Sequence, residues 1–216
     1  MYDDLKKEGW EIKWYNSSKN LLVFESLEKS SLAQSLEYAE AKSNIESWTA
    51  KYGIIKSQKE EKAVIVALEK SYGPLKLIRI NRGPIFIDKL ISHKDKVSIF
   101  KLIKREWSWF KGQLLFLAPI LSNNSINKRI LKSAGFINWS RKYYHSVWIN
   151  LSSSEQVLRS NLKGSWRRNL VISEKNNLEL NISRSMDDFE FLLSKYDKMM
   201  SDKDFKGSSL ELLKNY

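Results

Sequence analysis

The chain has 216 residues and a net charge of +12 at pH 7, with 42% hydrophobic and 29% charged residues, as in a globular protein of one domain or slightly more. It contains no cysteine and only two histidines, His93 and His145, which argues against disulfides, a zinc site or a Ser-His-Asp triad. The longest apolar run is shorter than a membrane span, and the first 15 residues lack the apolar core of a signal peptide.

The first 91 residues predict several strands and one helix. Residues 30–48 repeat apolar positions at helical spacing after a serine that can cap the helix. The strand candidates are rich in β-branched and aromatic residues, and two of them are joined by a Gly-Pro turn. These strand candidates are residues 10–15, 20–25, 48–57, 62–71 and 75–82.

Residues 92–151 predict helices alternating with strands. Apolar residues along one side predict a helix over 92–110, and a second helix from residue 125 is expected to end at Gly135. Residues 113–119 and 142–151 read as strands. This order of elements predicts an α/β fold with a mixed sheet and flanking helices.

The pattern starts again after residue 150. A capping sequence precedes a helix at 152–162, and a second helix should pack through Trp166 and Leu170. One strand, 177–183, and helices at 186–203 and 208–215 follow. A single strand cannot form a sheet, so part of the apolar stripe of the 186–203 helix is expected to stay exposed.

Four stretches in this order resemble the Fem family of aminoacyltransferases, which build the interpeptide bridges of peptidoglycan. They are SLAQSLEYAEAKSNIESW, RINRGPIF, LKSAGF with VWINL, and LKGSWRRNLVISEKNNLEL. The resemblance implies two acetyltransferase-like (GNAT-like) domains, the first at 1–150 and the beginning of a second at 151–216. It also implies aminoacyl-tRNA as donor and a UDP- or lipid-linked muramyl peptide as acceptor, with no cofactor, in the cytoplasm. Because the sequence stops where the second domain has only begun, we expect it to be an incomplete enzyme.

Lys42 is the first candidate for substrate binding. The resemblance implies a lysine near this position at the diphosphate of the acceptor, and a helix-borne ammonium group suits a phosphate oxygen. The alternative is a solvated lysine on the polar side of the helix.

Arg79 and Arg82 are two further candidates, on either side of Ile80 and Asn81. Strand alternation would place Arg79 with Asn81 on one face and Arg82 with Ile80 on the other. Gly83 would let a ligand approach closely, and an arginine beside such a turn suits a phosphate or carboxylate. A buried arginine bound to carbonyl groups is the alternative.

Arg167 and Arg168 are the last candidates. Successive helical residues point about 100° apart, so the two side chains cannot face the same way. We expect one arginine to anchor the helix at the border of its apolar face, while the other can reach an anion.

The basic charge leaves three functions open: a Fem-like aminoacyltransferase, an acyl-coenzyme A dependent N-acetyltransferase acting on a cell-surface sugar or precursor, and a noncatalytic nucleic-acid-binding module. An anionic membrane surface also fits as a partner, and a solubilising surface explains the charge equally well. The sequence assigns no catalytic residue and no metal ligand. It lacks the glycine-rich and paired-aromatic signatures of single-strand RNA modules, which disfavours the third function.

Overall fold

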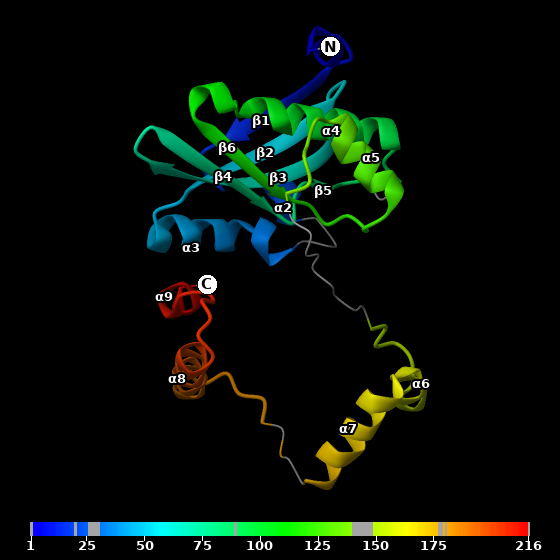
Figure 1. Ribbon diagram of the computed structural model, residues 1–216, viewed down its shortest axis with the longest axis vertical. Coiled ribbons are helices and arrows are strands. Elements are labelled where there is room, and N and C mark those ends of the chain that lie inside the picture. Colours follow the sequence, from blue (N-terminus) through cyan, green and yellow to red (C-terminus); the bar gives the residue numbers. More distant parts are fainter. Residues whose placement is uncertain are drawn as a thin grey trace. The chain divides into compact units, whose positions relative to one another are not determined.

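The computed structural model describes residues 2–19, 21–25, 31–88, 90–139, 149–176, 179 and 181–215 (Figure 1). It divides into two compact units. Unit 1 comprises residues 1–138 and 207–216, and unit 2 comprises residues 139–206. None of the described helices is long and apolar enough to cross a membrane.

Unit 1 is built around a mixed sheet in the order β1-β2-β3-β4-β6, and β5 pairs with β3. All the pairings are antiparallel except that of β4 with β6, which is parallel. The strands are β1 (Trp10–Tyr15), β2 (Thr49–Ser57), β3 (Glu60–Tyr72), β4 (Leu75–Asn81), β5 (Ile85–Phe86) and β6 (Gln113–Ala118). The predicted α/β class with a mixed sheet is therefore confirmed.

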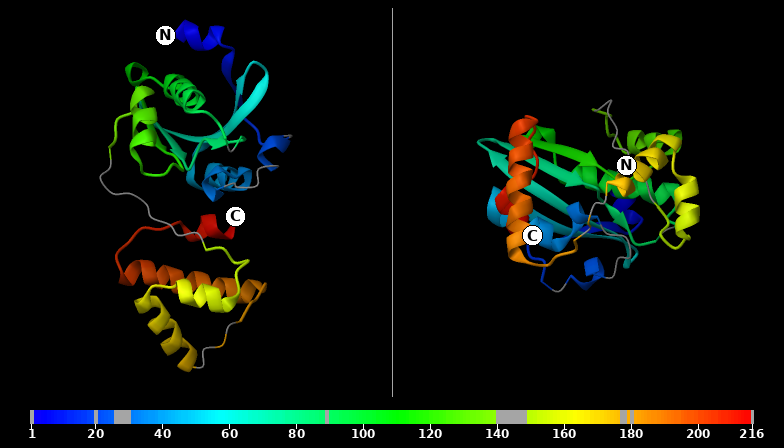
Figure 2. Two further views of the ribbon diagram at one scale, coloured as in Figure 1. Left: turned by 90° about the vertical axis from the view of Figure 1, so that its right-hand side faces the viewer. Right: turned by 90° about the horizontal axis from the view of Figure 1, so that it is seen from below.

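Helices cover both faces of this sheet (Figures 1 and 2). The helices of unit 1 are α1 (Tyr2–Lys7), α2 (Leu22–Glu25), η1 (Leu32–Gln34), α3 (Leu36–Glu46), α4 (His93–Glu106), η2 (Trp109–Lys111), α5 (Ser125–Ser133) and α9 (Leu210–Lys214). The side chains of the central strand β3 enter two cores in turn, because successive side chains of a strand point to opposite faces of the sheet. Ala63, Ile65 and Ala67 join the core beneath α4, whereas Val64 and Val66 join the core beneath α3. We call the second side the α3 face.

Gln34 of η1 closes a fork in the sheet. The strand β3 pairs with β5 through residues 63–64 and with β4 through residues 68–72, so its middle lacks a strand partner on this side. The buried Gln34 amide fills the gap: it accepts a hydrogen bond from Val66 N at 2.8 Å and donates to Val66 O at 3.0 Å and Asn81 O at 2.8 Å. A side-chain amide here replaces a stretch of neighbouring strand.

Several predicted elements of unit 1 differ from the structure. Of the strand predicted over 20–25, residues 21–25 are described and are not in a strand, since 22–25 form the short helix α2. The helix predicted over 30–48 is split, and α3 starts after Ser35, whose hydroxyl accepts a hydrogen bond from Tyr38 N. The helix predicted over 92–110 ends at residue 106, because Trp107 adopts an extended backbone. Gly135, with φ of +83°, follows α5 in the left-handed conformation expected of a C-terminal cap.

Unit 2 is helical in its described part, which contains α6 (Glu155–Asn161), α7 (Gly164–Lys175) and α8 (Met186–Asp202). Of the strand predicted over 177–183, residues 179 and 181–183 are described and are not in a strand. The strand predicted over 142–151, with His145, lies outside the described residues except for its last three, which are also not in a strand.

The expected packing of α7 is wrong, whereas the expectation for α8 is confirmed. Trp166 is 68% exposed and no residue of α7 is buried, so the packing expected through Trp166 and Leu170 is not seen. On α8, Leu193 is buried but Leu192 is 62% exposed, so the apolar stripe is only partly covered.

Candidate substrate-binding site

Lys42 lies on α3 and is mostly buried. Its ammonium group is 2.6 Å from the carboxylate of Glu46, one turn further along the helix. It also lies 5.6 Å from the centre of the Tyr38 ring. Since a lysine this far from solvent is held by a carboxylate and an aromatic face, an anionic ligand would reach it by replacing the carboxylate of Glu46.

Arg79 lies on β4 beside Trp48, the residue that follows the turn at the end of α3. The guanidinium carbon of Arg79 is 5.9 Å from the centre of the Trp48 ring, and the ammonium group of Lys70 is 5.7 Å from it. Lys70 also donates a hydrogen bond of 2.8 Å to the backbone carbonyl of Glu46. Two cations therefore share one indole ring next to the helix that carries Lys42.

The sheet register places these groups on the same face. Arg79 is paired with Leu68, which belongs to the core beneath α3, and with Phe116 of β6. Ile80 points the other way into the core beneath α4, as strand alternation predicts. Phe116 is 44% exposed, so the α3 face presents an accessible aromatic ring next to Arg79.

Arg82 lies just beyond β4, at the carboxyl end of the parallel pair. Its backbone has a φ of +63°, and its N–H donates a hydrogen bond of 2.7 Å to Ala118 O of β6. Because β4 ends at Asn81, strand alternation does not set the direction of the exposed Arg82 side chain. Gly83 packs so closely on Gln34 that a Cβ atom there would overlap the amide group.

Arg167 and Arg168 belong to unit 2 and have different surroundings. Arg167 donates hydrogen bonds of 3.0 Å to the carbonyl oxygens of Ser160 and Leu162 at the end of α6. The side chain of Arg168 is exposed and makes no hydrogen bond or ion pair with any other residue in the described part of the chain. The expectation that one arginine anchors the helix is met by Arg167, although the anchor is the end of α6 rather than an apolar core.

Two groups with shifted pKa values lie on opposite sides of the sheet. Burial, together with the carboxylates of Glu40 and Glu37, raises the pKa of Tyr52 beneath α3 to about 12. Burial alone would raise the pKa of Glu69, but hydrogen bonds from Trp107 and Lys76, together with the charge of Lys51, lower it below its ordinary value. Neither group therefore titrates near neutral pH, and neither is a ready general acid or base.

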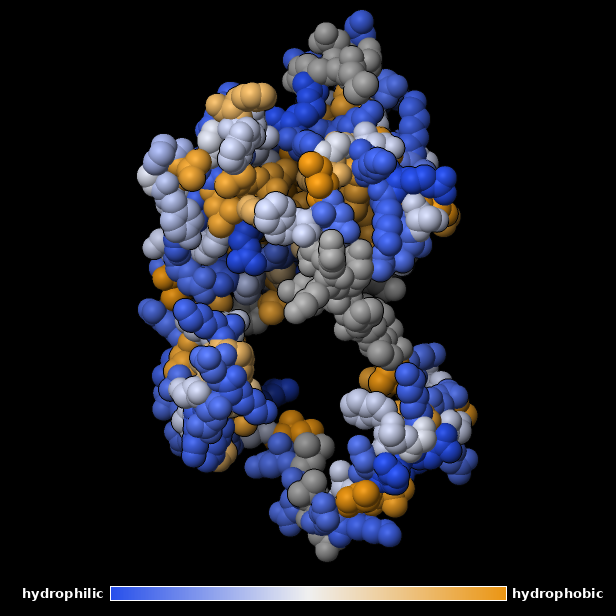
Figure 3. All heavy atoms as spheres, viewed as in Figure 1, coloured by the Kyte–Doolittle hydropathy of each residue, from blue (hydrophilic) through white to orange (hydrophobic). Residues whose placement is uncertain are grey.

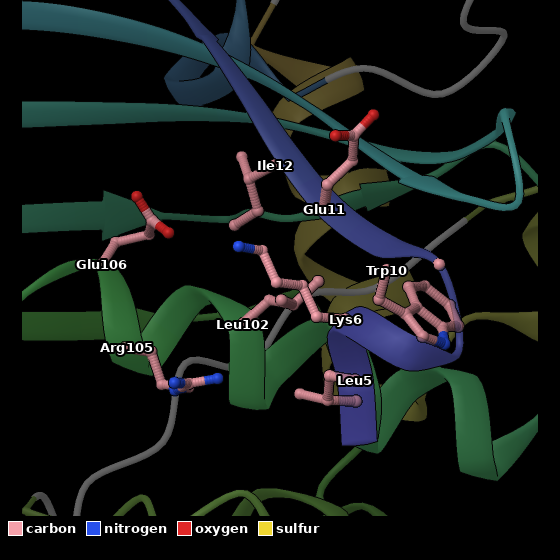
Figure 4. Close-up of a pocket in the computed structure, with 9 residues that line it drawn as sticks. Leu5, Lys6, Trp10, Glu11, Ile12, Leu102, Arg105 and Glu106 are labelled. Carbon is pink, nitrogen blue, oxygen red and sulfur yellow. The ribbon is translucent and has the colours of Figure 1, made fainter. Parts of the chain in front are cut away.

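A cavity of about 300 Å³ lies between β1 and the helices α1 and α4 (Figure 4). Leu102, Arg105 and Glu106 line one wall, and none of the five predicted binding residues contributes to the cavity. Within the described ranges, no group of three or more histidine, cysteine or acidic residues could hold a metal ion.

Sequence reasoning missed Glu46, Trp48 and Lys70 as members of the site. Glu46 could have been found, because an acidic residue four positions after Lys42 predicts an ion pair on a helix. The approach of Lys70 and Arg79 to Trp48 depends on the register of three strands, which no local pattern gives.

Comparison with solved structures identifies the fold. FemX matches 95% of this chain with a TM-score of 0.68 and 16% sequence identity. The chain has the fold of FemX. It spans 53% of the length of FemX, and the match includes residues of both units. The resemblance to the Fem family is thus confirmed at the level of the fold.

Other comparisons add little. A protein described as a possible acetyltransferase from Clostridium difficile 630 is 10% identical over 66% of this chain and all of that protein, with a TM-score of 0.39, too low to support any argument. No family model matches the sequence, and no curated protein matches it.

Proposed function

We propose that this chain carries the acceptor-binding part of a Fem-like aminoacyltransferase, which transfers an amino acid from aminoacyl-tRNA to the peptide of a peptidoglycan precursor. The FemX fold supports the proposal. The observation that carries it is the arrangement of Lys42 and Arg79 on the same face of the sheet, linked through Glu46, Lys70 and Trp48. The reaction would take place in the cytoplasm, where aminoacyl-tRNA is made.

The proposed ligand of this face is the diphosphate of a UDP- or lipid-linked muramyl peptide. A diphosphate carries more negative charge than the carboxylate of Glu46 and can replace it at Lys42. Arg79 adds a planar guanidinium group, and Trp48 and Phe116 offer aromatic surfaces to a ring of the ligand. Arg82 extends the site to the carboxyl end of the parallel strands, where ligands of α/β sheets commonly bind.

The proposed chemistry is aminolysis of an ester. The side-chain amine of the acceptor peptide attacks the carbonyl carbon of the aminoacyl ester, an amide bond forms, and the C–O bond to the tRNA ribose breaks. The amine loses a proton and the ribose oxygen gains one. Positioning of the two substrates and stabilisation of the oxyanion would supply most of the rate. Arg168 in unit 2 is the exposed cation proposed to contact the phosphate backbone of the donor, with Arg167 holding its helix.

Thermal unfolding with a UDP-muramyl pentapeptide tests the proposal. The ligand should raise the melting temperature of the chain, more at low salt than at high salt, because a bound ligand stabilises the folded state and the contact is ionic. Lys42→Ala should reduce this shift. Lys56→Ala is the matched control, since Lys56 is also partly buried and is paired with a glutamate, Glu61, at 3.0 Å. Glu46→Gln should increase the shift, because it removes the carboxylate that competes for Lys42.

The same assay distinguishes the alternatives. An equal ligand-induced shift in Lys42→Ala and wild type would remove Lys42 from the site. A shift with coenzyme A but not with the muramyl peptide would favour the N-acetyltransferase, and a shift only with RNA would favour the nucleic-acid-binding module.

A further inference from the structure

Two neighbouring loops of unit 1 expose a group of large apolar and aromatic side chains. The β3–β4 turn carries Tyr72 and Leu75, which are 55% and 46% exposed. The 3-10 turn η2 carries Trp109 and Phe110, which are 64% and 99% exposed. We call these four residues the aromatic corner.

The two loops are held together by the backbone. Lys76 N donates a hydrogen bond of 2.9 Å to Gly112 O, and a Cβ atom at Gly112 would lie 2.7 Å from Pro74 O. Gly112 has a φ of +68°, which closes the turn after Phe110 and starts β6. Figure 3 shows apolar atoms exposed at this end of the sheet, where the chain enters β6 in the ribbon of Figure 1. The aromatic corner is therefore a fixed feature of the sheet edge.

The charge around the aromatic corner is positive. The two segments that form it, KSYGPLK (70–76) and WSWFKGQ (107–113), contain three lysines and no acidic residue. Glu69, which precedes the first segment, is buried and bound by Lys51 and Lys76. Glu106, which precedes the second, is exposed and accepts a hydrogen bond of 2.7 Å from Trp14 Nε1. Lys111 is exposed next to Phe110. The surface thus combines exposed apolar groups with lysines and has no exposed carboxylate within its two loops.

We propose that the aromatic corner docks on the surface of an anionic lipid bilayer. Tryptophan and tyrosine are suited to the membrane–water interface, where the ring is apolar and the polar atom stays hydrated. Binding of this kind combines buried apolar area with the attraction of lysines to anionic headgroups. A residue as exposed as Phe110 projects from the surface, and a projecting apolar side chain fits a deformable bilayer without needing a matching pocket in a protein partner.

Vesicle flotation with the 216-residue chain tests the proposal. The protein should bind vesicles containing phosphatidylglycerol and not those of phosphatidylcholine alone, and salt should weaken the binding. Phe110→Ser should lower the affinity about tenfold, because one large apolar side chain no longer enters the bilayer. Lys111→Gln should lower it about fivefold. Ile137→Ser is the matched control, since Ile137 is 90% exposed outside the aromatic corner, and it should bind as wild type does.

A fluorescent label reports which surface enters the bilayer. The chain has no cysteine, so Phe110→Cys and Ile137→Cys can each be labelled at one position with an environment-sensitive dye. The dye at position 110 should shift to the blue with anionic vesicles, and the dye at position 137 should not.

Three results would overturn the proposal: no binding to anionic vesicles, unchanged binding after Phe110→Ser, or an equal response of both labels. A response of the dye at position 110 to tRNA or heparin as large as its response to vesicles would instead identify a general polyanion site. Neither assay uses the donor or the acceptor, so the outcome is independent of the proposed function.

Discussion

Replacing Gln34 should weaken the fold at the fork between β3 and β4. Gln34→Met keeps the length of the side chain but leaves Val66 N, Val66 O and Asn81 O without their hydrogen-bond partner. An unsatisfied buried backbone group costs about 1–3 kcal/mol, so losing the partner of all three should cost about 3–9 kcal/mol. For a protein of this size, that corresponds to a fall in melting temperature of at least about 6 °C.

Hydrogen exchange at Val66 gives a local measurement for this variant. The amide of Val66 donates to Gln34 rather than to a strand, so its exchange should accelerate in Gln34→Met more than that of its neighbours. Gln113→Met is the control, because the side chain of Gln113 accepts one hydrogen bond, from Ser108 N at 3.0 Å. If both variants lowered the melting temperature equally and Val66 stayed protected, Gln34 would not be holding the fork.

Two further predictions concern ionisable groups. The folded state holds the pKa of Glu69 below its ordinary value. As pH falls below about 5, the unfolded state therefore binds a proton at this carboxylate more readily than the folded state does. Stability from Glu69 should therefore be present at neutral pH and decline in acid, and Glu69→Gln should be less stable at pH 7 with a flatter acid profile in urea titrations. In unit 2, Arg167→Ala should speed hydrogen exchange at the end of α6, whereas Arg168→Ala should not; equal effects would contradict the anchoring role of Arg167.

Much of unit 1 could be predicted from sequence because its elements follow local rules. The strands at 10–15, 48–57 and 62–71 are runs of β-branched and aromatic residues, and Gly135 ends its helix as a left-handed cap. The strand prediction for 20–25 was wrong because an apolar run this short has no spacing of apolar residues that distinguishes a strand from a helix. The whole sheet register, and with it the place of Arg79 beside Trp48, depends on contacts distant in sequence.

The prediction for Trp166 failed for a different reason. A helix with an apolar side was assumed to have a partner, yet the described part of unit 2 has no strand on which α7 could pack. The prediction for the two arginines after Trp166 was better, because helical geometry alone requires the side chains of successive residues to point in different directions. Which arginine has which role depended on the position of α6, and the sequence does not give that position.

The return of the chain to unit 1 couples the folding of the two units. Residues 139–206 leave unit 1 and come back to it, so that α9 packs on α3, the helix of Lys42, and buries Leu212. Closing an unstructured loop of roughly 70 residues costs about 4 kcal/mol of chain entropy. A folded unit 2 shortens that loop. When unit 2 is unfolded, the packing of the five residues of α9 must offset the full entropy lost in closing the loop. Unfolding of unit 2 should thus loosen α9 and expose part of α3, although no residue of the helix itself has changed.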